Sequence, residues 1–149
     1  MKVEIKIDSQ YEETSVIIVT NELTDEVREL SKMLSGSNER FIVGFADGAS
    51  GTAAVLENDK IIRIYSANQK VRIVTENGEY ISKLRLYELE ERLPRGEFVR
   101  VSNSEIVHLS KVKDFDLSFS GSICVRFSDN STTYVSRRYV SKIKKYLGM

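Results

Sequence analysis

The first forty residues carry the hydrophobic pattern of two strands followed by a helix. Residues 3–7 alternate apolar and charged side chains, which predicts a half-buried strand, and the apolar run at residues 16–19 predicts a strand buried on both faces. Thr24 is placed to cap a helix with apolar side chains at helical spacing, and Gly36 can end that helix in a left-handed conformation. The pattern therefore predicts an N-terminal strand, strand and helix unit.

From residue 41 onward the pattern changes to short strands separated by turns. Asn77 and Gly78 separate two alternating segments, and because both residues tolerate positive φ they predict a hairpin. Helical spacing returns at residues 84–93, and Pro94 with Gly96 ends this second helix. The predicted strands in this part cover residues 41–45, 52–56, 61–67, 70–76 and 79–82.

The last third of the chain predicts three more strands and a final helix. Residues 98–101 form one strand, and residues 114–119 pair with residues 122–128 across a turn at residues 120–121. Ser136 can cap the C-terminal helix, on which apolar side chains form one stripe and basic side chains occupy the remaining arc. The stripe contains Tyr139, Val140, Ile143, Tyr146 and Leu147.

Charge is distributed unevenly along a chain whose formal net charge is zero. Residues 1–59 hold five Lys or Arg against twelve Asp or Glu, and residues 60–149 hold seventeen against ten, so the two parts carry −7 and +7. The last fifteen residues contain five basic side chains and no acidic one. A local basic surface favours binding to a polyanion such as nucleic acid, and the alternative is that these charges form ordinary solvated faces.

The composition is that of a chain with one sizeable core and no membrane span. No apolar run approaches the roughly 20 residues that cross a bilayer, and the N-terminus lacks the pattern of a signal peptide, so we expect a cytoplasmic protein. Cys124 and His108 are the only cysteine and histidine, which excludes an internal disulfide and a Cys/His zinc site. We expect no metal and no cofactor.

Residues typical of catalytic sites do not occur here in catalytic arrangements. Glu90 and Glu91 are adjacent on a predicted helix, where neighbouring side chains point about 100° apart. Asp114 and Asp116 share a strand face without a basic neighbour that would give them different protonation states. Cys124 lies in an alternating strand, where a thiol is usually a packing group. We therefore expect a protein that is not an enzyme and has no small-molecule substrate.

Three polar clusters stand at the ends of predicted strands. They comprise residues 68–70, Arg100 with residues 102–104, and residues 136–138. Arginine can bridge the two acceptors of guanine, asparagine can pair with adenine, and serine hydroxyls suit phosphates. Such clusters could contact a DNA groove together if the fold brings the strand ends to one side.

Four blocks of the sequence resemble the LytTR family of bacterial DNA-binding domains. The longest are residues 98–112, FVRVSNSEIVHLSKV, and residues 134–143, YVSRRYVSKI. The resemblance extends back through residues 61–66 and 84–94 and covers roughly residues 45–149, with the order of the blocks kept. It implies a mainly β (α+β) fold of about ten strands in small packed antiparallel sheets with a short C-terminal helix. The hydrophobic pattern adds the N-terminal strand, strand and helix unit, which we place at residues 1–44.

The resemblance also implies a function and a set of contact residues. Family members regulate transcription by binding direct repeats in double-stranded promoter DNA through loops in the major groove, as a homodimer on the DNA. Asn103 and Arg138 match the base-contacting positions, whereas Arg100, Ser104 and Arg137 would hold phosphates or orient their neighbours. The remaining expected DNA contacts are Lys70, in the first cluster, and Ser136, in the third.

Three positions depart from the family pattern, and the departures bear on base preference. Ser102 replaces a common histidine, His108 replaces a common asparagine, and Val71 lies near a position that is often polar. The chain also resembles the stand-alone form of the family, because a receiver domain of about 120 residues does not fit before residue 47. The resemblance then implies regulation by a partner, such as a membrane protein.

Each expected contact has a structural alternative. Arg138 could pair with a carboxylate of the acidic N-terminal unit, and Asn103 could satisfy its own turn. The alternative function is a protein-interaction module, in which the acidic unit docks a regulatory partner and DNA binding is weak or absent.

Overall fold

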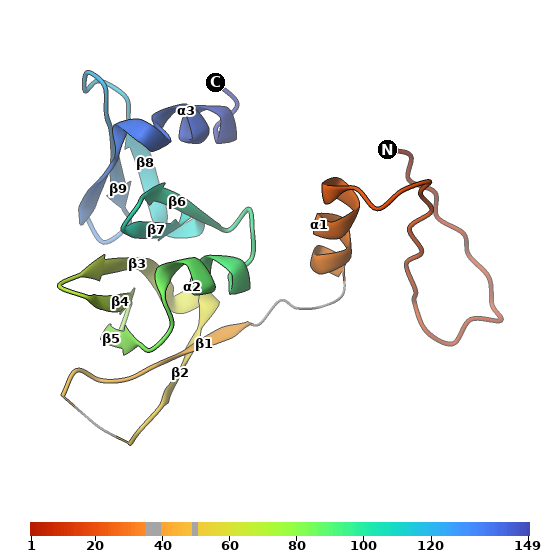
Figure 1. Cartoon of the computed structure of the whole chain (residues 1–149), viewed down its shortest axis with the longest axis horizontal. Coiled ribbons are helices and arrows are strands. Elements are labelled where there is room, and N and C mark those ends of the chain that lie inside the picture. The colour runs from red at the N-terminus through yellow and green to blue at the C-terminus, as the bar shows by residue number, and fades with distance from the viewer. Residues whose placement is uncertain (35–39, 49–50) are drawn as a thin grey trace. The chain divides into compact units, whose positions relative to one another are not determined.

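The computed structural model describes residues 1–34, 40–48 and 51–149. The chain divides into two compact units, Met1–Ser37 and Asn38–Met149 (Figure 1). Ten strands, all paired antiparallel, and three α-helices occur in the described residues, which confirms the mainly β prediction. No helix there is long and apolar enough to span a membrane.

In the described residues 1–34 of the first unit, the one regular element is α1 (Asp25–Leu34). The Thr24 hydroxyl accepts a hydrogen bond from the Val27 backbone N–H at 3.3 Å, as the predicted cap requires. The two predicted strands are wrong for this structure, because neither residues 3–7 nor residues 16–19 form a strand. A strand needs a partner for its backbone N–H and C=O groups, and neither segment has one here. The predicted end of the helix at Gly36 lies outside the described residues.

The second unit is organised around a five-stranded sheet with the strand order β5-β4-β3-β7-β6. The predicted hairpin is confirmed, with a shift of one residue: Thr75 pairs with Gly78, so Glu76 and Asn77 form the turn and Gly78 carries the positive φ of 133°. The strands are β3 (Ile61–Ala67), β4 (Lys70–Thr75), β5 (Gly78–Ser82), β6 (Phe98–Ser102) and β7 (Glu105–His108).

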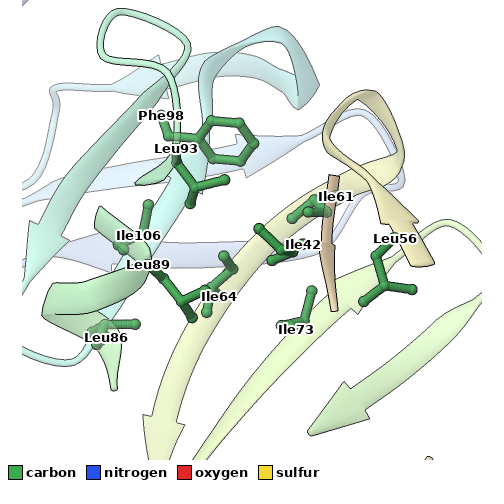
Figure 2. Packing of buried hydrophobic residues seen from close by; sticks show 10 residues of the cluster. All are labelled: Ile42, Leu56, Ile61, Ile64, Ile73, Leu86, Leu89, Leu93, Phe98 and Ile106. Carbon is green, nitrogen blue, oxygen red and sulfur yellow. The ribbon is translucent and has the colours of Figure 1, made fainter. Parts of the chain in front are cut away.

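One face of this sheet is covered by α2 (Leu86–Arg92) and by the hairpin of β1 (Phe41–Gly44) and β2 (Ala54–Glu57). Figure 2 shows the resulting core, in which the leucines of α2 lie against isoleucines of the sheet. Its fully buried members include Ile61, Ile64, Ile73 and Leu89. Burial of this apolar surface, at about 25 cal/mol per Å², is the main term that holds the two layers together.

The opposite face packs on a three-stranded sheet with the order β10-β9-β8 and on α3 (Arg137–Tyr146). β3 serves both cores, since Ile62 belongs to the second core whereas Ile61 and Ile64 belong to the first. The register shift between Ile61 and Arg63 explains how Ile61 and Ile64, three positions apart, share one face. The sheet is therefore buried on both faces. The strands of the small sheet are β8 (Val112–Asp116), β9 (Ile123–Phe127) and β10 (Thr132–Val135).

Two local predictions in this region need correction. The strand expected at residues 114–119 is β8, which ends at Asp116, so residues 117–122 form a loop instead of a tight turn. The side chains of Leu117 and Phe119, which suggested a longer strand, are 40% and 47% exposed. Ser136 occupies the predicted N-cap position of α3, but its hydroxyl makes no capping hydrogen bond. Two short 3-10 turns, Asn58–Lys60 and Leu109–Lys111, join β2 to β3 and β7 to β8.

Candidate nucleic-acid interface

The three polar clusters meet at one end of the second unit. Antiparallel pairing of β3 with β7 places the β3–β4 turn beside the β6–β7 turn, and the Ser66 N–H donates to the Ser104 carbonyl oxygen at 2.8 Å. The Ser136 N–H donates to the Val101 carbonyl oxygen at 3.0 Å, which attaches the start of α3 to the end of β6. We call the surface made by residues 68–70, 102–104 and 136–138 the turn face; its strand turns lie on the left in Figure 1.

Asn68 and Gln69 form the tip of the first cluster. Both have positive φ, 50° and 63°, which is the geometry of a tight type I′ hairpin, and both are exposed. Lys70 follows them, and its Nζ lies 3.5 Å from Oδ1 of Asp47. The positive charge of Lys70, and to a smaller extent the hydrogen bond from Arg72, holds the pKa of the Asp47 carboxyl below its ordinary value. The positive charge of Lys70 is therefore partly compensated within the chain.

Arg100 braces the second cluster from below. Its Nε donates to the Ser102 carbonyl oxygen at 2.8 Å, its Nη2 donates to the Asn103 carbonyl oxygen, and its Nη1 pairs with Glu90 of α2. The side chain is only 14% exposed. Because all three guanidinium nitrogens already donate within the chain, this geometry suits the orienting role more than a phosphate contact.

Asn103 and Ser104 form the exposed tip that Arg100 supports. The Asn103 Oδ1 accepts a hydrogen bond from the Tyr139 hydroxyl at 3.1 Å, so its side chain is held by α3 and not by its own turn. The Asn103 Nδ2 amide has no hydrogen-bond partner in the described chain and can donate to a ligand. The Ser104 N–H is bonded to the Ser102 hydroxyl oxygen at 3.2 Å.

Arg137 and Arg138 begin α3 and are both exposed. Among the described residues of the second unit, neither guanidinium forms an ion pair with a carboxylate. The N-terminus of a helix also presents unpaired backbone N–H groups and the positive end of its dipole. This corner of the turn face is therefore the part best suited to attract an anion.

Several residues that shape the turn face could not be recognised from the sequence pattern. Tyr139 belongs to the apolar stripe of α3, yet its hydroxyl positions Asn103. Glu105 is buried behind the tip, where its two carboxylate oxygens accept hydrogen bonds from Arg63 at 2.8 Å and Thr133 at 2.6 Å. The Glu105 carboxylate therefore links β7 to β3 of its own sheet and to β10 of the three-stranded sheet. No local sequence signal marks either role, because each depends on contacts between distant elements.

His108 lies away from the turn face. It is 4% exposed, its Nδ1 is 2.7 Å from the Ile61 carbonyl oxygen, and its ring stacks on Phe98 with centroids 4.2 Å apart. The family departure at this position is therefore a feature of the core. Ser102 does lie at the turn face, half-buried, with its hydroxyl 3.3 Å from that of Ser104.

Comparison with known proteins follows the same part of the chain. The family model of the LytTr DNA-binding domain matches residues 52–148. The chain belongs to this family. A solved LytTr DNA-binding domain from Bacillus cereus superimposes with a TM-score of 0.69, covering 74% of this chain and 99% of that one at 20% sequence identity, and so shares the fold. The family assignment confirms the expectation of a DNA-binding protein and not an enzyme.

Similar proteins extend the match to the whole chain. Uncharacterized HTH-type transcriptional regulators from Staphylococcus aureus strains MSSA476 and MRSA252 are 30% and 29% identical over 150 residues, which cover 100% of this chain and 99% of each relative. A helix-turn-helix requires two consecutive helices. In the described residues, strands separate every pair of α-helices, so no helix-turn-helix occurs among them.

Proposed function

We propose that this LytTr protein is a sequence-specific transcriptional regulator that binds direct repeats in double-stranded promoter DNA. The turn face enters the major groove, Asn103 and Arg138 contact base edges, and Arg137, Ser104, Ser136 and Lys70 contact the phosphates beside them. Arg100 orients the Asn103 tip from inside the protein. Two subunits act together on the paired half-sites, and the protein works in the cytoplasm, where its promoters are.

The observation that supports this proposal most directly is that the three polar clusters lie at one end of the second unit and carry side-chain donors that are free to bind a ligand. The Asn103 Nδ2 group and the Arg138 guanidinium are exposed, stand on segments that main-chain hydrogen bonds hold together, and have no partner within the described part of the second unit, while the Asn103 Oδ1 is held by the Tyr139 hydroxyl. The Tyr139 hydroxyl fixes the Asn103 side chain, so its donor loses little entropy when it binds a base edge, whereas the Arg138 side chain is ordered only on binding. The apolar cores behind them make the supporting scaffold rigid.

The proposal is tested by selecting bound duplexes from a random pool and measuring the affinity of variants for the selected site. Arg138→Ala should weaken binding to that site by about 1–3 kcal/mol, the worth of one bidentate base contact, with a much smaller loss on random DNA. Lys144→Ala is the matched control, since Lys144 is an exposed cation on the same helix outside the turn face. Equal losses on both DNAs would assign Arg138 to a phosphate. Failure to enrich any site would contradict sequence-specific binding.

The second candidate function is a protein-interaction module whose acidic N-terminal unit docks a regulatory partner, such as a membrane protein. Its specific support is the first unit, in which α1 begins with Asp25 and Glu26 and none of the residues of this helix is buried. Salt dependence separates the two candidates. Binding to DNA that falls steeply between about 50 and 200 mM salt reflects counterion release from phosphates. A flat response on every duplex would favour the protein partner.

A further inference from the structure

The N-terminal segment has the pattern of a strand but no strand partner in the described chain. The apolar side chains of Val3, Ile5 and Ile7 are 77%, 88% and 94% exposed. Lys2 Nζ lies 2.8 Å from Glu4 Oε1, which shows that alternate charged residues project to the same side. Residues 2–8 therefore have one charged side and one apolar side, and residues 2–7 are exposed. Asp8 is half-buried, and its Oδ1 accepts a hydrogen bond from the Gln10 N–H at 3.0 Å, so its other carboxylate oxygen is the one available to a partner.

This segment is complementary to a second copy of itself in one antiparallel register. When Ile5 lies opposite Ile5 of the other copy, Val3 lies opposite Ile7, Glu4 opposite Lys6, and Lys2 opposite Asp8. Each of these pairs occurs twice because a two-fold axis passes between the two Ile5 residues. All charged pairs are then of opposite sign, and all apolar side chains meet on the other face.

The neighbouring registers lack this complementarity. A two-fold axis at Glu4 would place Lys2 opposite Lys6, and an axis at Lys6 would place Glu4 opposite Asp8, so each brings like charges together. A shift of the register by one residue, or by any odd number, would place apolar side chains opposite charged ones. Axes at Val3 or Ile7 also bring opposite charges together, as Lys2 with Glu4 or Lys6 with Asp8, but each forms only one kind of charged pair. The charge pattern therefore favours the register centred on Ile5, in which two kinds of charged pair form.

We propose that residues 2–8 form an antiparallel strand pair with the same residues of a second chain and so make the protein a homodimer. The other apolar segment of the unit, residues 15–20, contains no charged side chain. Pairing with it would leave Lys2, Glu4, Lys6 and Asp8 without cross-strand charge partners, so a second copy fits this edge better. The dimer goes beyond the proposed DNA-binding function and forms without DNA.

Charge reversal tests the proposed register in the full-length protein without DNA. In sedimentation equilibrium the wild type should dimerise, and Glu4→Lys and Lys6→Glu should each weaken the dimer at least about tenfold because each creates two like-charge pairs. An equimolar mixture of the two variants should recover dimers, since the new lysine side chain of one chain then faces the new glutamate side chain of the other. Glu13→Lys is the control, with the same charge change outside the paired segment. A monomeric wild type, or variants that dimerise as well as the control, would overturn the proposal.

Cysteine cross-linking tests the position of the axis. Ile5→Cys should form an intermolecular disulfide under mild oxidation, because residues opposite one another in an antiparallel pair have Cα atoms about 5 Å apart. Val3→Cys should not cross-link to itself, since the two positions would lie about 13 Å apart along the strands. The wild-type chain shows any contribution of its buried Cys124. Cross-linking of Val3→Cys but not Ile5→Cys would contradict the register. Because neither experiment contains DNA, its outcome is independent of promoter binding.

Discussion

Replacing Arg100 by glutamine tests whether this side chain orients the Asn103 tip or contacts DNA itself. The change removes the ion pair with Glu90 and the guanidinium donors to the carbonyl oxygens of Ser102 and Asn103. A hydrogen bond from a charged group contributes about 1.5–3 kcal/mol, but Glu90 is 42% exposed, so solvent screens the ion pair. Glutamine can also retain one bond. We expect a loss of about 2–3 kcal/mol in the free energy of unfolding.

The binding assay separates the two roles through salt dependence. A positioning role predicts weaker binding to the selected site with an unchanged slope of log K against log salt, because no phosphate contact is lost. Arg126→Gln is the matched control: Arg126 pairs with Asp114 and Asp116, is 46% exposed, and lies on β9. We expect it to change stability much less than Arg100→Gln does, because solvent screens both of its ion pairs. If Arg100→Gln lowers the salt slope by about 1 and destabilises no more than the control, the positioning role is wrong.

Three further predictions concern the tip, the core and the response to acid. Tyr139→Phe removes only the hydroxyl that holds Asn103, so binding to the selected site should weaken several-fold while urea denaturation shifts by about 1 kcal/mol or less. His108→Ala should cost about 2–4 kcal/mol of stability, because a buried ring and its hydrogen bonds are lost, and selection should return the same DNA site. The hydroxyl of Ser118 and, with a smaller effect, its backbone N–H donate hydrogen bonds to Asp116 and hold the pKa of that carboxyl below its ordinary value. The ionised Asp116 carboxylate therefore stabilises the fold at neutral pH, and this contribution is lost as the pH falls through the lowered pKa. Asp116→Asn should therefore lose less stability than the wild type on acidification, and an identical acid titration of unfolding would contradict this.

Most strands of the second unit were predicted from the hydrophobic pattern, but β7 (Glu105–His108) and β10 (Thr132–Val135) were not. The expected strand at residues 61–67 coincides with β3, and the helix at residues 84–93 contains α2. Strand ends were less predictable, as in β8, where exposed Leu117 and Phe119 continue the alternation beyond the last ladder pair. Alternation records which side chains are apolar, whereas a strand ends where its neighbour stops providing hydrogen bonds.

The N-terminal unit shows the same limit more strongly. Residues 3–7 alternate as regularly as any strand of the second unit, yet they form none in the described structure. A hydrophobic period specifies a face to bury and not the partner that buries it. We propose that the partner of this segment is the same segment of a second chain, so the structure of one chain shows it unpaired.

The sequence by itself determined the mainly β class, the order of most elements, the family and the identity of the polar clusters, because these follow from local pattern and residue chemistry. Only the tertiary structure decided that the clusters share one surface, that Arg100 is used inside the protein, and that Tyr139 holds Asn103 across 36 positions of the chain. These roles arise from pairing between β3 and β7 and from the packing of α3 on β6. Contacts between distant segments depend on the closure of the whole fold, and no local spacing in the sequence encodes them.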